Sequence, residues 1–236
     1  ASHVSDSLHA RFSAPDCHEL LNTLTYDRTY IIDLTGKTPE KIAAAMPKDG
    51  RRGVKRAERV AKEAGVVIKD ETGMDRATFD EVYRVLEETS ERDGFTPHSA
   101  DVYWTMLTTL GEQARMYVAR LDGRPVAWVL VVVNGISAVA YYGASTTADR
   151  ATRAAEATDW YAACDLAAKG YKGYDFMGAG STRVPELYSV GMYKKRFAQH
   201  PTEVDGAWDV PVHPLIYRAL RRARRARHFV RDRLGV

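Results

Sequence analysis

The chain has 236 residues, of which 45% are hydrophobic and 28% are charged, with a formal net charge of +3. These proportions are ordinary for a globular protein of one large domain. The longest apolar run, residues 126–133 (VAWVLVVV), is too short to cross a bilayer, and the N-terminus lacks the basic and apolar stretches of a signal peptide. We therefore expect a cytoplasmic protein with no membrane span.

The first half of the chain is expected to be mainly helical. Thr38 and Asp75 are suited to cap helices, and Gly65 is suited to end one. Apolar residues recur at helical spacing between residues 79 and 86. Strands are expected at 29–34 and 66–69, and helices at 38–46, 50–64, 75–92 and 99–110.

The middle of the chain reads as an antiparallel meander. Asp122-Gly123 and Asn134-Gly135 are typical of tight hairpin turns, which need positive φ. Strands are expected at 116–121, 126–133, 138–143 and 173–177, and helices at 151–169, 187–198 and from 210 onward. This order predicts an α+β domain with a mixed sheet flanked by helices. It resembles the GCN5-related N-acetyltransferase (GNAT) fold.

Five segments together resemble the Fem family, whose members are non-ribosomal aminoacyl-tRNA-dependent transferases that build peptidoglycan cross-bridges. They are residues 31–68, 86–104 (LEETSERDGFTPHSADVYW), 139–145 (VAYYGAS), the Asp159-Trp160 helix with 170–181 (GYKGYDFMGAGS), and 187–197 (LYSVGMYKKRF). Each motif is weak alone, but their order and spacing match over residues 28–217. We expect an N-terminal arm at 1–27, a single transferase domain at 28–217 and an arginine-rich C-terminal helix at 218–236.

The chain departs from the family in two respects. Fem members that act on cell-wall precursors carry two acyltransferase-like subdomains, and this chain has room for one. It looks like a minimal member, similar to single-domain homologues that aminoacylate peptidyl-nucleoside antibiotics such as pacidamycin. Either the acceptor is smaller than a cell-wall precursor or the chain is a fragment. His98 lies near the position where precursor-binding members carry a phosphate-contacting arginine.

The resemblance implies transfer of an amino acid, with alanine favoured and glycine or serine as alternatives, from aminoacyl-tRNA to the amino group of a small acceptor. A peptidyl-nucleoside intermediate is the favoured acceptor. Aminoacyl-tRNA is a co-substrate, and no cofactor or metal is expected, because the histidines are scattered and the two cysteines lie in unrelated contexts. Three alternatives stay open: a peptidoglycan-bridge aminoacyltransferase, an acetyl-CoA-dependent N-acetyltransferase and a noncatalytic basic module. The [QR]-x-x-G-x-[GA] loop that commonly binds CoA is absent.

Two residues are candidates for catalysis. An aminoacyl ester is already activated, so the enzyme must mainly hold the attacking amine and stabilise the oxyanion. Lys194 matches the family's essential lysine, to which that stabilising role is attributed. Asp175 follows a strand in YDFMG and could bind or polarise the acceptor amine, or simply accept bonds from loop amides.

Further residues are candidates for contact with the acceptor, some through the family's corresponding tyrosines. Tyr193 takes the place of the family's phenylalanine in the lysine motif. Alternation along a strand sends only one of Tyr141 and Tyr142 into the site. The full acceptor-binding set is Tyr193, Tyr142, Tyr141, Ser145, Arg92, His98 and Tyr103.

Two basic clusters are candidates for tRNA binding. Residues 218–236 hold eight arginines against one aspartate, and a second cluster runs from residue 48 to 62. Such clusters attract nucleic-acid phosphates, although solvated helix faces and basic tails also have this composition. The predicted tRNA-binding residues are Arg51, Arg52, Lys55, Arg56, Arg59, Lys195, Arg221, Arg222, Arg224 and Arg225.

Overall fold

The computed structural model describes residues 26–182, 184–204 and 211–234. The strands are β1 (Arg28–Asp33), β2 (Val67–Asp70), β3 (Ala114–Leu121), β4 (Arg124–Asn134), β5 (Ser137–Ser145), β6 (Gly173–Gly178) and β7 (Thr202–Glu203). They form one seven-stranded sheet in the order β2-β3-β4-β5-β6-β1-β7. Only the β5–β6 pairing is parallel among the described strands. The predicted α+β architecture with a mixed sheet is therefore confirmed.

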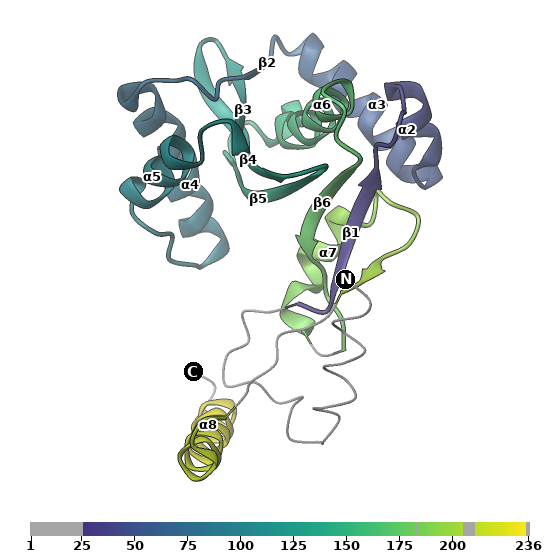
Figure 1. Cartoon of the computed structure of the whole chain (residues 1–236). Helices are drawn as coiled ribbons and strands as arrows, with labels where there is room; N and C mark the ends of the chain where they lie inside the picture. The colour runs from purple at the N-terminus through teal and green to yellow at the C-terminus, as the bar shows by residue number, and fades with distance from the viewer. Residues whose placement is uncertain (1–25, 183, 205–210, 235–236) are drawn as a thin grey trace.

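Helices cover both faces of this sheet (Figure 1). They are α2 (Pro39–Ala45), α3 (Lys48–Glu63), α4 (Arg76–Asp93), α5 (Ala100–Leu110), α6 (Ala154–Ala168), α7 (Tyr188–Lys194) and α8 (Pro214–Leu234). Asp75 caps α4 as expected, because its carboxylate accepts a 2.8 Å hydrogen bond from the amide of Thr78. The predicted arm at residues 1–27 lies almost wholly outside the described residues.

Several element boundaries differ from the sequence expectations. Residues Arg150–Thr152 form a single 3-10 turn, so α6 begins three residues later than predicted. The second hairpin turn is displaced by one residue: Asn134 still pairs with Ser137, and the two-residue turn starts at Gly135, whose φ is 58°. Helix α7 ends at Lys194 rather than at residue 198.

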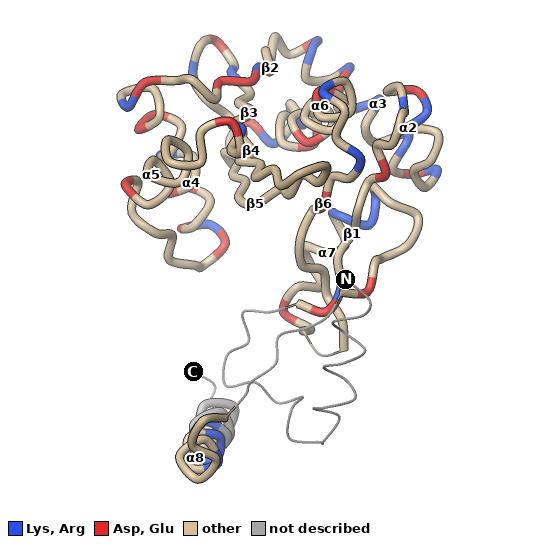
Figure 2. The backbone as a smooth tube through the Cα atoms, viewed as in Figure 1, with Lys and Arg blue, Asp and Glu red and all other residues tan. Residues whose placement is uncertain are grey.

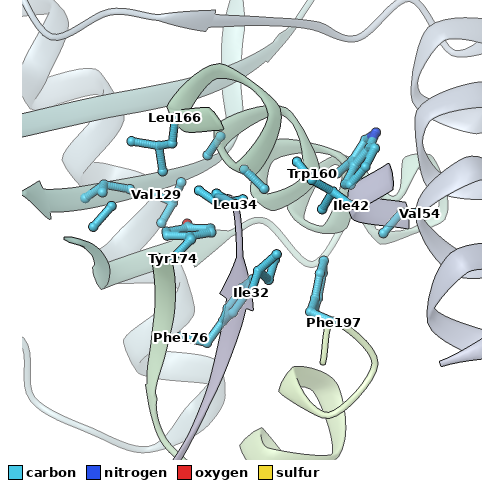
Figure 3. Close-up of a cluster of buried hydrophobic side chains, with 14 of the residues drawn as sticks. Ile32, Leu34, Ile42, Val54, Val129, Trp160, Leu166, Tyr174, Phe176 and Phe197 are labelled. Atoms are coloured by element: carbon cyan, nitrogen blue, oxygen red, sulfur yellow. The ribbon is translucent and has the colours of Figure 1, made fainter. Parts of the chain in front are cut away.

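Along the central strands, buried side chains point alternately to the two faces of the sheet. Tyr117, Val129 and Val131 pack with α2, α3 and α6 on one face, in the cluster of Figure 3. Met116 and Leu130 pack with α4 and α5 on the other face. Because β3 and β4 are covered on both sides, their sequences are almost continuously apolar.

The sheet divides between β5 and β6. These two strands pair only at Ser137–Gly173, Ala138–Tyr174 and Val139–Asp175. Beyond those three pairs they diverge, as Figure 1 shows. A bulge in β5 at Tyr141 bends that strand, since Tyr142 pairs with Leu130 while Ala140 pairs with Val131. The chain that follows β6 includes α7, and α7 lies beside the end of β6 where the two strands have separated.

Charged side chains gather unevenly over this framework. Figure 2 shows lysine and arginine along α3 and α8.

No helix in the described part of the chain is long and apolar enough to cross a membrane.

Candidate active site

Lys194 is the last residue of α7 and lies half-buried beside the end of β6. Its Nζ donates a 2.7 Å hydrogen bond to the carbonyl oxygen of Gly178. Burial lowers the pKa of Lys194 to about 8, against the opposing effect of the carboxylates of Asp159 and Asp175. Lys194 is thus a partly buried cation near the carboxylates of Asp159 and Asp175, and its pKa is lowered toward neutral pH.

Asp159, on α6, is a hydrogen-bond acceptor for Tyr193, the residue before Lys194. Its Oδ2 accepts a 2.5 Å hydrogen bond from the hydroxyl of Tyr193. Burial raises the pKa of Asp159 to about 6, although the Tyr193 hydrogen bond and the charge of Lys194 oppose this rise. The ring of Tyr174 is fully buried, and burial together with the Asp159 charge raises the pKa of its hydroxyl. The hydroxyl of Tyr193 therefore points toward α6.

Asp175 has hydrogen-bonding partners of its own. Its Oδ1 accepts from the hydroxyl of Thr29 on β1 and, over 2.7 Å, from the amide of Met177. Met177 adopts a left-handed conformation with φ of 59°, which is uncommon for a residue other than glycine. Among the described residues no hydrogen bond reaches Oδ2.

A pocket of about 410 Å³ opens beside Tyr193, between the end of β5, the start of α6 and the end of α7. Arg150, Arg153 and Arg196 line it, together with the first residues of α6. Arg153 is the N-cap residue, and its side chain does not cap the helix amides. Three arginines and the N-terminal end of α6 thus line one space, together with the carboxylates of Asp149 and Glu156.

Glu156 fixes two of these arginines. It is 5% exposed; its Oε2 pairs with Arg153, and its Oε1 lies 3.5 Å from Nη1 of Arg196. Helix α3 approaches at the same point, because a Cβ at Gly53 would lie 2.8 Å from Oε1. Asp149, which also lines the pocket, is bound by both terminal nitrogens of Arg124.

The predicted acceptor tyrosines form an aromatic cluster on the other side of β5. The ring centroids of Tyr103 and Tyr142 are 4.7 Å apart, and those of Tyr141 and Tyr142 are 4.9 Å apart. Tyr103 is buried, and Tyr142 packs against the core of α4 and α5. Tyr141 is 41% exposed. Burial raises the pKa of Tyr26, and the charges of Asp175 and Tyr141 add to that rise. Tyr141 is thus the more exposed member of the Tyr141–Tyr142 pair.

Three other predicted acceptor contacts lie at the end of β5 and the start of α5. Arg92 donates to the Ser145 carbonyl oxygen over 2.8 Å and binds Asp93 through Nε and Nη2. His98 is exposed, and its backbone is bonded to the hydroxyls of Tyr83 and Tyr103. These contacts tie α4 to β5 and order the loop before α5. The structure does not bring Arg92 or His98 to Lys194.

The predicted tRNA-binding residues fall on separate surfaces. On α3, the buried residues Gly50, Val54, Ala57 and Ala61 form one face, and the basic residues occupy the exposed side. Lys195 is exposed next to the site lysine. Arg221, Arg222 and Arg224 are on α8, and the side chain of Arg225 lies outside the described residues.

Sequence reasoning missed Asp159 and the pocket arginines as site residues. Glu156 and Asp159 are acidic residues one turn apart in a helix whose other residues are mostly buried, and that pattern was a usable signal. Arg150 and Arg153 carry no comparable signal. In the part of the chain that the structure describes, no three His, Cys, Asp or Glu side chains gather as metal ligands would.

Comparison with known proteins identifies the family of this fold. The profile of the acetyltransferase (GNAT) domain family matches residues 48–195, more than half of the chain. The chain belongs to the GNAT family. No curated protein matches the sequence of this GNAT chain.

Solved structures share the fold of this GNAT chain at low sequence identity. FemX superposes with a TM-score of 0.71 and 16% identity, covering 83% of this chain and 64% of FemX. The C-terminal domain of a protein assigned as a lysylphosphatidylglycerol synthetase, from Agrobacterium fabrum, gives 0.59 and 13%, covering 80% and 61%. A Bacteroides thetaiotaomicron protein of unknown function gives 0.59 and 10%, covering 88% and 66%. This GNAT chain therefore spans about two thirds of the length of these proteins and shares their fold.

Proposed function

We propose that this GNAT chain is an aminoacyl-tRNA-dependent transferase that forms a peptide bond on the amino group of a small acceptor. The observation that carries the proposal is the position of Lys194. It lies half-buried beside the end of β6, near the carboxylates of Asp159 and Asp175, and it follows Tyr193, which lines an arginine-rich pocket. The Fem motifs and the fold shared with FemX support the same reaction class.

The reaction joins an uncharged amine to an activated ester. The amine nitrogen attacks the ester carbonyl carbon, the C–N bond forms, and the tetrahedral oxyanion then expels the ribose oxygen as the C–O bond breaks. The Lys194 ammonium stabilises the oxyanion. Oδ2 of Asp175 holds the incoming amine, and the amine proton finally passes to the leaving ribose oxygen or to water. Neither carboxylate forms a covalent bond.

The donor end of tRNA is assigned to the arginine-lined pocket. The phosphates near the 3′ end would meet Arg150, Arg153 and Arg196 at the start of α6, as phosphates commonly bind at helix N-termini. The exposed basic side of α3 would meet backbone phosphates farther along the acceptor stem. Phosphate contacts position a nucleic acid without reading its sequence. Alanine is the favoured amino acid, and glycine and serine are the alternatives.

The acceptor is assigned to the side of β5 that carries the aromatic cluster of Tyr103, Tyr141 and Tyr142. Tyr141, with the neighbouring Tyr26, offers ring faces and phenol hydroxyls beside Asp175. Planar rings stack well on such a surface. A peptidyl-nucleoside is therefore the favoured acceptor, and a peptidoglycan precursor is the second candidate. A cytoplasmic location remains a prediction.

A second donor is favoured by the family itself. The GNAT profile names acetyltransferases, and the same three arginines could hold the phosphates of acetyl-CoA. The loop before α6 is TTADRATR, which has none of the glycines of the usual CoA pyrophosphate loop. This composition favours the tRNA donor.

One experiment separates the two donors. Purified chain is incubated with radiolabelled alanyl-, glycyl- or seryl-tRNA, and separately with labelled acetyl-CoA, each with a panel of peptidyl-nucleoside amines. Label transfer from tRNA alone is the expected result. Transfer from acetyl-CoA alone would overturn the proposal, as would full activity of a Lys194→Ala variant.

A further inference from the structure

Helix α8 carries a strip of apolar residues that face water. Leu215, Ile216 and Leu220 are 80%, 59% and 53% exposed. At the helical rotation of about 100° per residue, the apolar positions gather within an arc of about 140°. These positions are 215, 216, 219, 220, 223 and 226. The helix lies apart from the sheet and its covering helices (Figure 1), so this strip does not belong to the core.

Over residues 215–226 the remaining circumference of the helix is basic apart from Tyr217, whereas farther along the sequence Arg227 and Arg233 fall at angles within the apolar arc. Arg218, Arg221, Arg222 and Arg224 fall outside the apolar arc at the same rotation, and the segment 218–236 holds eight arginines and one aspartate. Figure 2 shows lysine and arginine in blue along this helix. An RNA partner would use the arginines and leave the apolar strip in water. A surface that combines anionic groups with an apolar layer uses both sides of the helix at once.

We propose that α8 binds the surface of an anionic phospholipid bilayer, lying in the plane of the headgroups. Leu215, Ile216 and Leu220 insert toward the acyl chains, and the flanking arginines lie among the lipid phosphates. The helix lies on the bilayer and does not cross it, because its arginines leave no long apolar segment. The transferase domain is thereby held at a membrane surface. This surface is independent of the identity of the acyl donor.

Vesicle sedimentation with the full chain tests the proposal. The probes are vesicles of phosphatidylcholine alone and of phosphatidylcholine mixed with phosphatidylglycerol. Partition onto the anionic vesicles is expected to be at least about tenfold stronger and to weaken with added salt. A Leu215→Gln/Leu220→Gln variant keeps every charge, and an Arg221→Gln/Arg222→Gln variant keeps the apolar strip. Each is expected to lower partition by about tenfold.

The matched control is Val67→Gln, because Val67 on β2 has the same exposed fraction as Leu220, 53%. Its partition should equal that of the unaltered chain, and thermal melting of all three variants should be unchanged. Absence of binding to anionic vesicles overturns the proposal. So does a lower melting temperature or a smaller oligomer for the Leu215→Gln/Leu220→Gln variant, because the strip is then covered by protein. Loss of tRNA binding in the Arg221→Gln/Arg222→Gln variant, without any vesicle effect, identifies an RNA-binding helix instead.

Discussion

The hydroxyl of Tyr193 donates a 2.5 Å hydrogen bond to Oδ2 of Asp159, which joins the motif of the site lysine to the buried helix α6. Tyr193 stands where the Fem motif that this segment resembles has phenylalanine. Here the additional hydroxyl gives the buried carboxylate of Asp159 a hydrogen-bond donor. This bond connects the stability of the fold to the position of Lys194, the next residue in the chain.

Replacement of Tyr193 by phenylalanine should therefore destabilise the protein. The aromatic packing against Phe197 is kept, but the buried carboxylate of Asp159 loses the hydrogen bond from Tyr193. We expect the free energy of unfolding to fall by about 1–3 kcal/mol, measured by urea denaturation. The control is Tyr161→Phe, an exposed tyrosine on the same helix as Asp159, with an expected change below about 0.5 kcal/mol. Equal effects of the two variants would remove the role assigned to the bond.

Removal of the Lys194 ammonium should affect the chemical step rather than tRNA binding. For Lys194→Ala we expect kcat to fall by at least about a hundredfold, the usual effect of losing one oxyanion-stabilising group. The KM for aminoacyl-tRNA should change by less than about threefold. Lys195→Ala is the matched control: it removes the neighbouring exposed lysine and should leave kcat unchanged. Single-turnover assays distinguish the two, and a pure KM effect in Lys194→Ala would contradict the assignment.

The activity should fall at alkaline pH because the Lys194 ammonium is lost. With its pKa lowered to about 8, the charged form predominates below that pH and disappears above it. We expect kcat to decline above pH 8 by about tenfold per pH unit. Lys194→Arg keeps its charge in this range and should lack the alkaline decline at lower overall activity. The same decline in Lys194→Arg would assign it to another group.

The same pKa shift should appear in the stability of the fold. The folded pKa of Lys194 lies below that of an unfolded lysine, so the unfolded chain binds more protons between pH 8 and about 10.4. The free energy of unfolding should therefore rise with pH across this window, relative to a Lys194→Met variant. Parallel urea titrations at several pH values measure this difference. A constant difference would mean that the lysine is not buried in solution.

Charge reversal on α3 should weaken tRNA binding and reduce its dependence on salt. Arg52→Glu and Lys55→Glu alter exposed residues on the basic side of the helix. We expect each to lower the slope of log affinity against log salt by about one, the loss of one phosphate contact. The control is Arg84→Glu on α4, which makes the same charge change on the helices covering the opposite face of the sheet. Unchanged slopes for both α3 variants would place the RNA surface elsewhere.

The contact of α3 with the segment after α7 should make one helical glycine irreplaceable. An alanine usually stabilises a helix interior relative to glycine, by about 1 kcal/mol. At Gly50, however, a Cβ would lie 1.6 Å from the carbonyl oxygen of Arg196. We expect Gly50→Ala to destabilise the fold by about 1–3 kcal/mol. Gly73→Ala, which would meet nothing within 4 Å, is the control for urea denaturation. A stabilising Gly50→Ala would show that α3 and this segment do not touch.

Most elements of the fold could be predicted from the sequence because their signals are local. Asp75 caps α4, Asp122-Gly123 makes the β3–β4 turn with φ values of 50° and 81°, and residues 126–133 form a strand buried on both faces. The errors have local causes too. The 3-10 turn before α6 is separated from the helix by Arg153, whose left-handed φ of 57° is uncommon for a residue other than glycine and has no sequence signal.

The candidate site was less predictable, because its contacts join distant segments. Tyr193 and Asp159 are 34 positions apart, and Thr29 and Asp175 are 146 apart. Periodicity and turn chemistry carry no information on which helices meet beneath the diverging strands. Arg92 shows the same limit, because only the fold reveals that its guanidinium contacts Asp93 and the β5 end. The family resemblance identified Lys194 as a candidate, and the structure identified the residues around it.

The insertion of β1 between β6 and β7 has a consequence for how the protein folds. Strand β1 is made early by the ribosome, but its partner β6 emerges more than a hundred residues later, as the Thr29–Asp175 separation of 146 shows. Pairings of such high contact order form slowly, because a long loop must close first. The β2–β5 meander can assemble while β1 is still without its partner β6. The strand that positions Asp175 is therefore expected to be completed late, so that a newly made chain acquires its secondary structure before its activity.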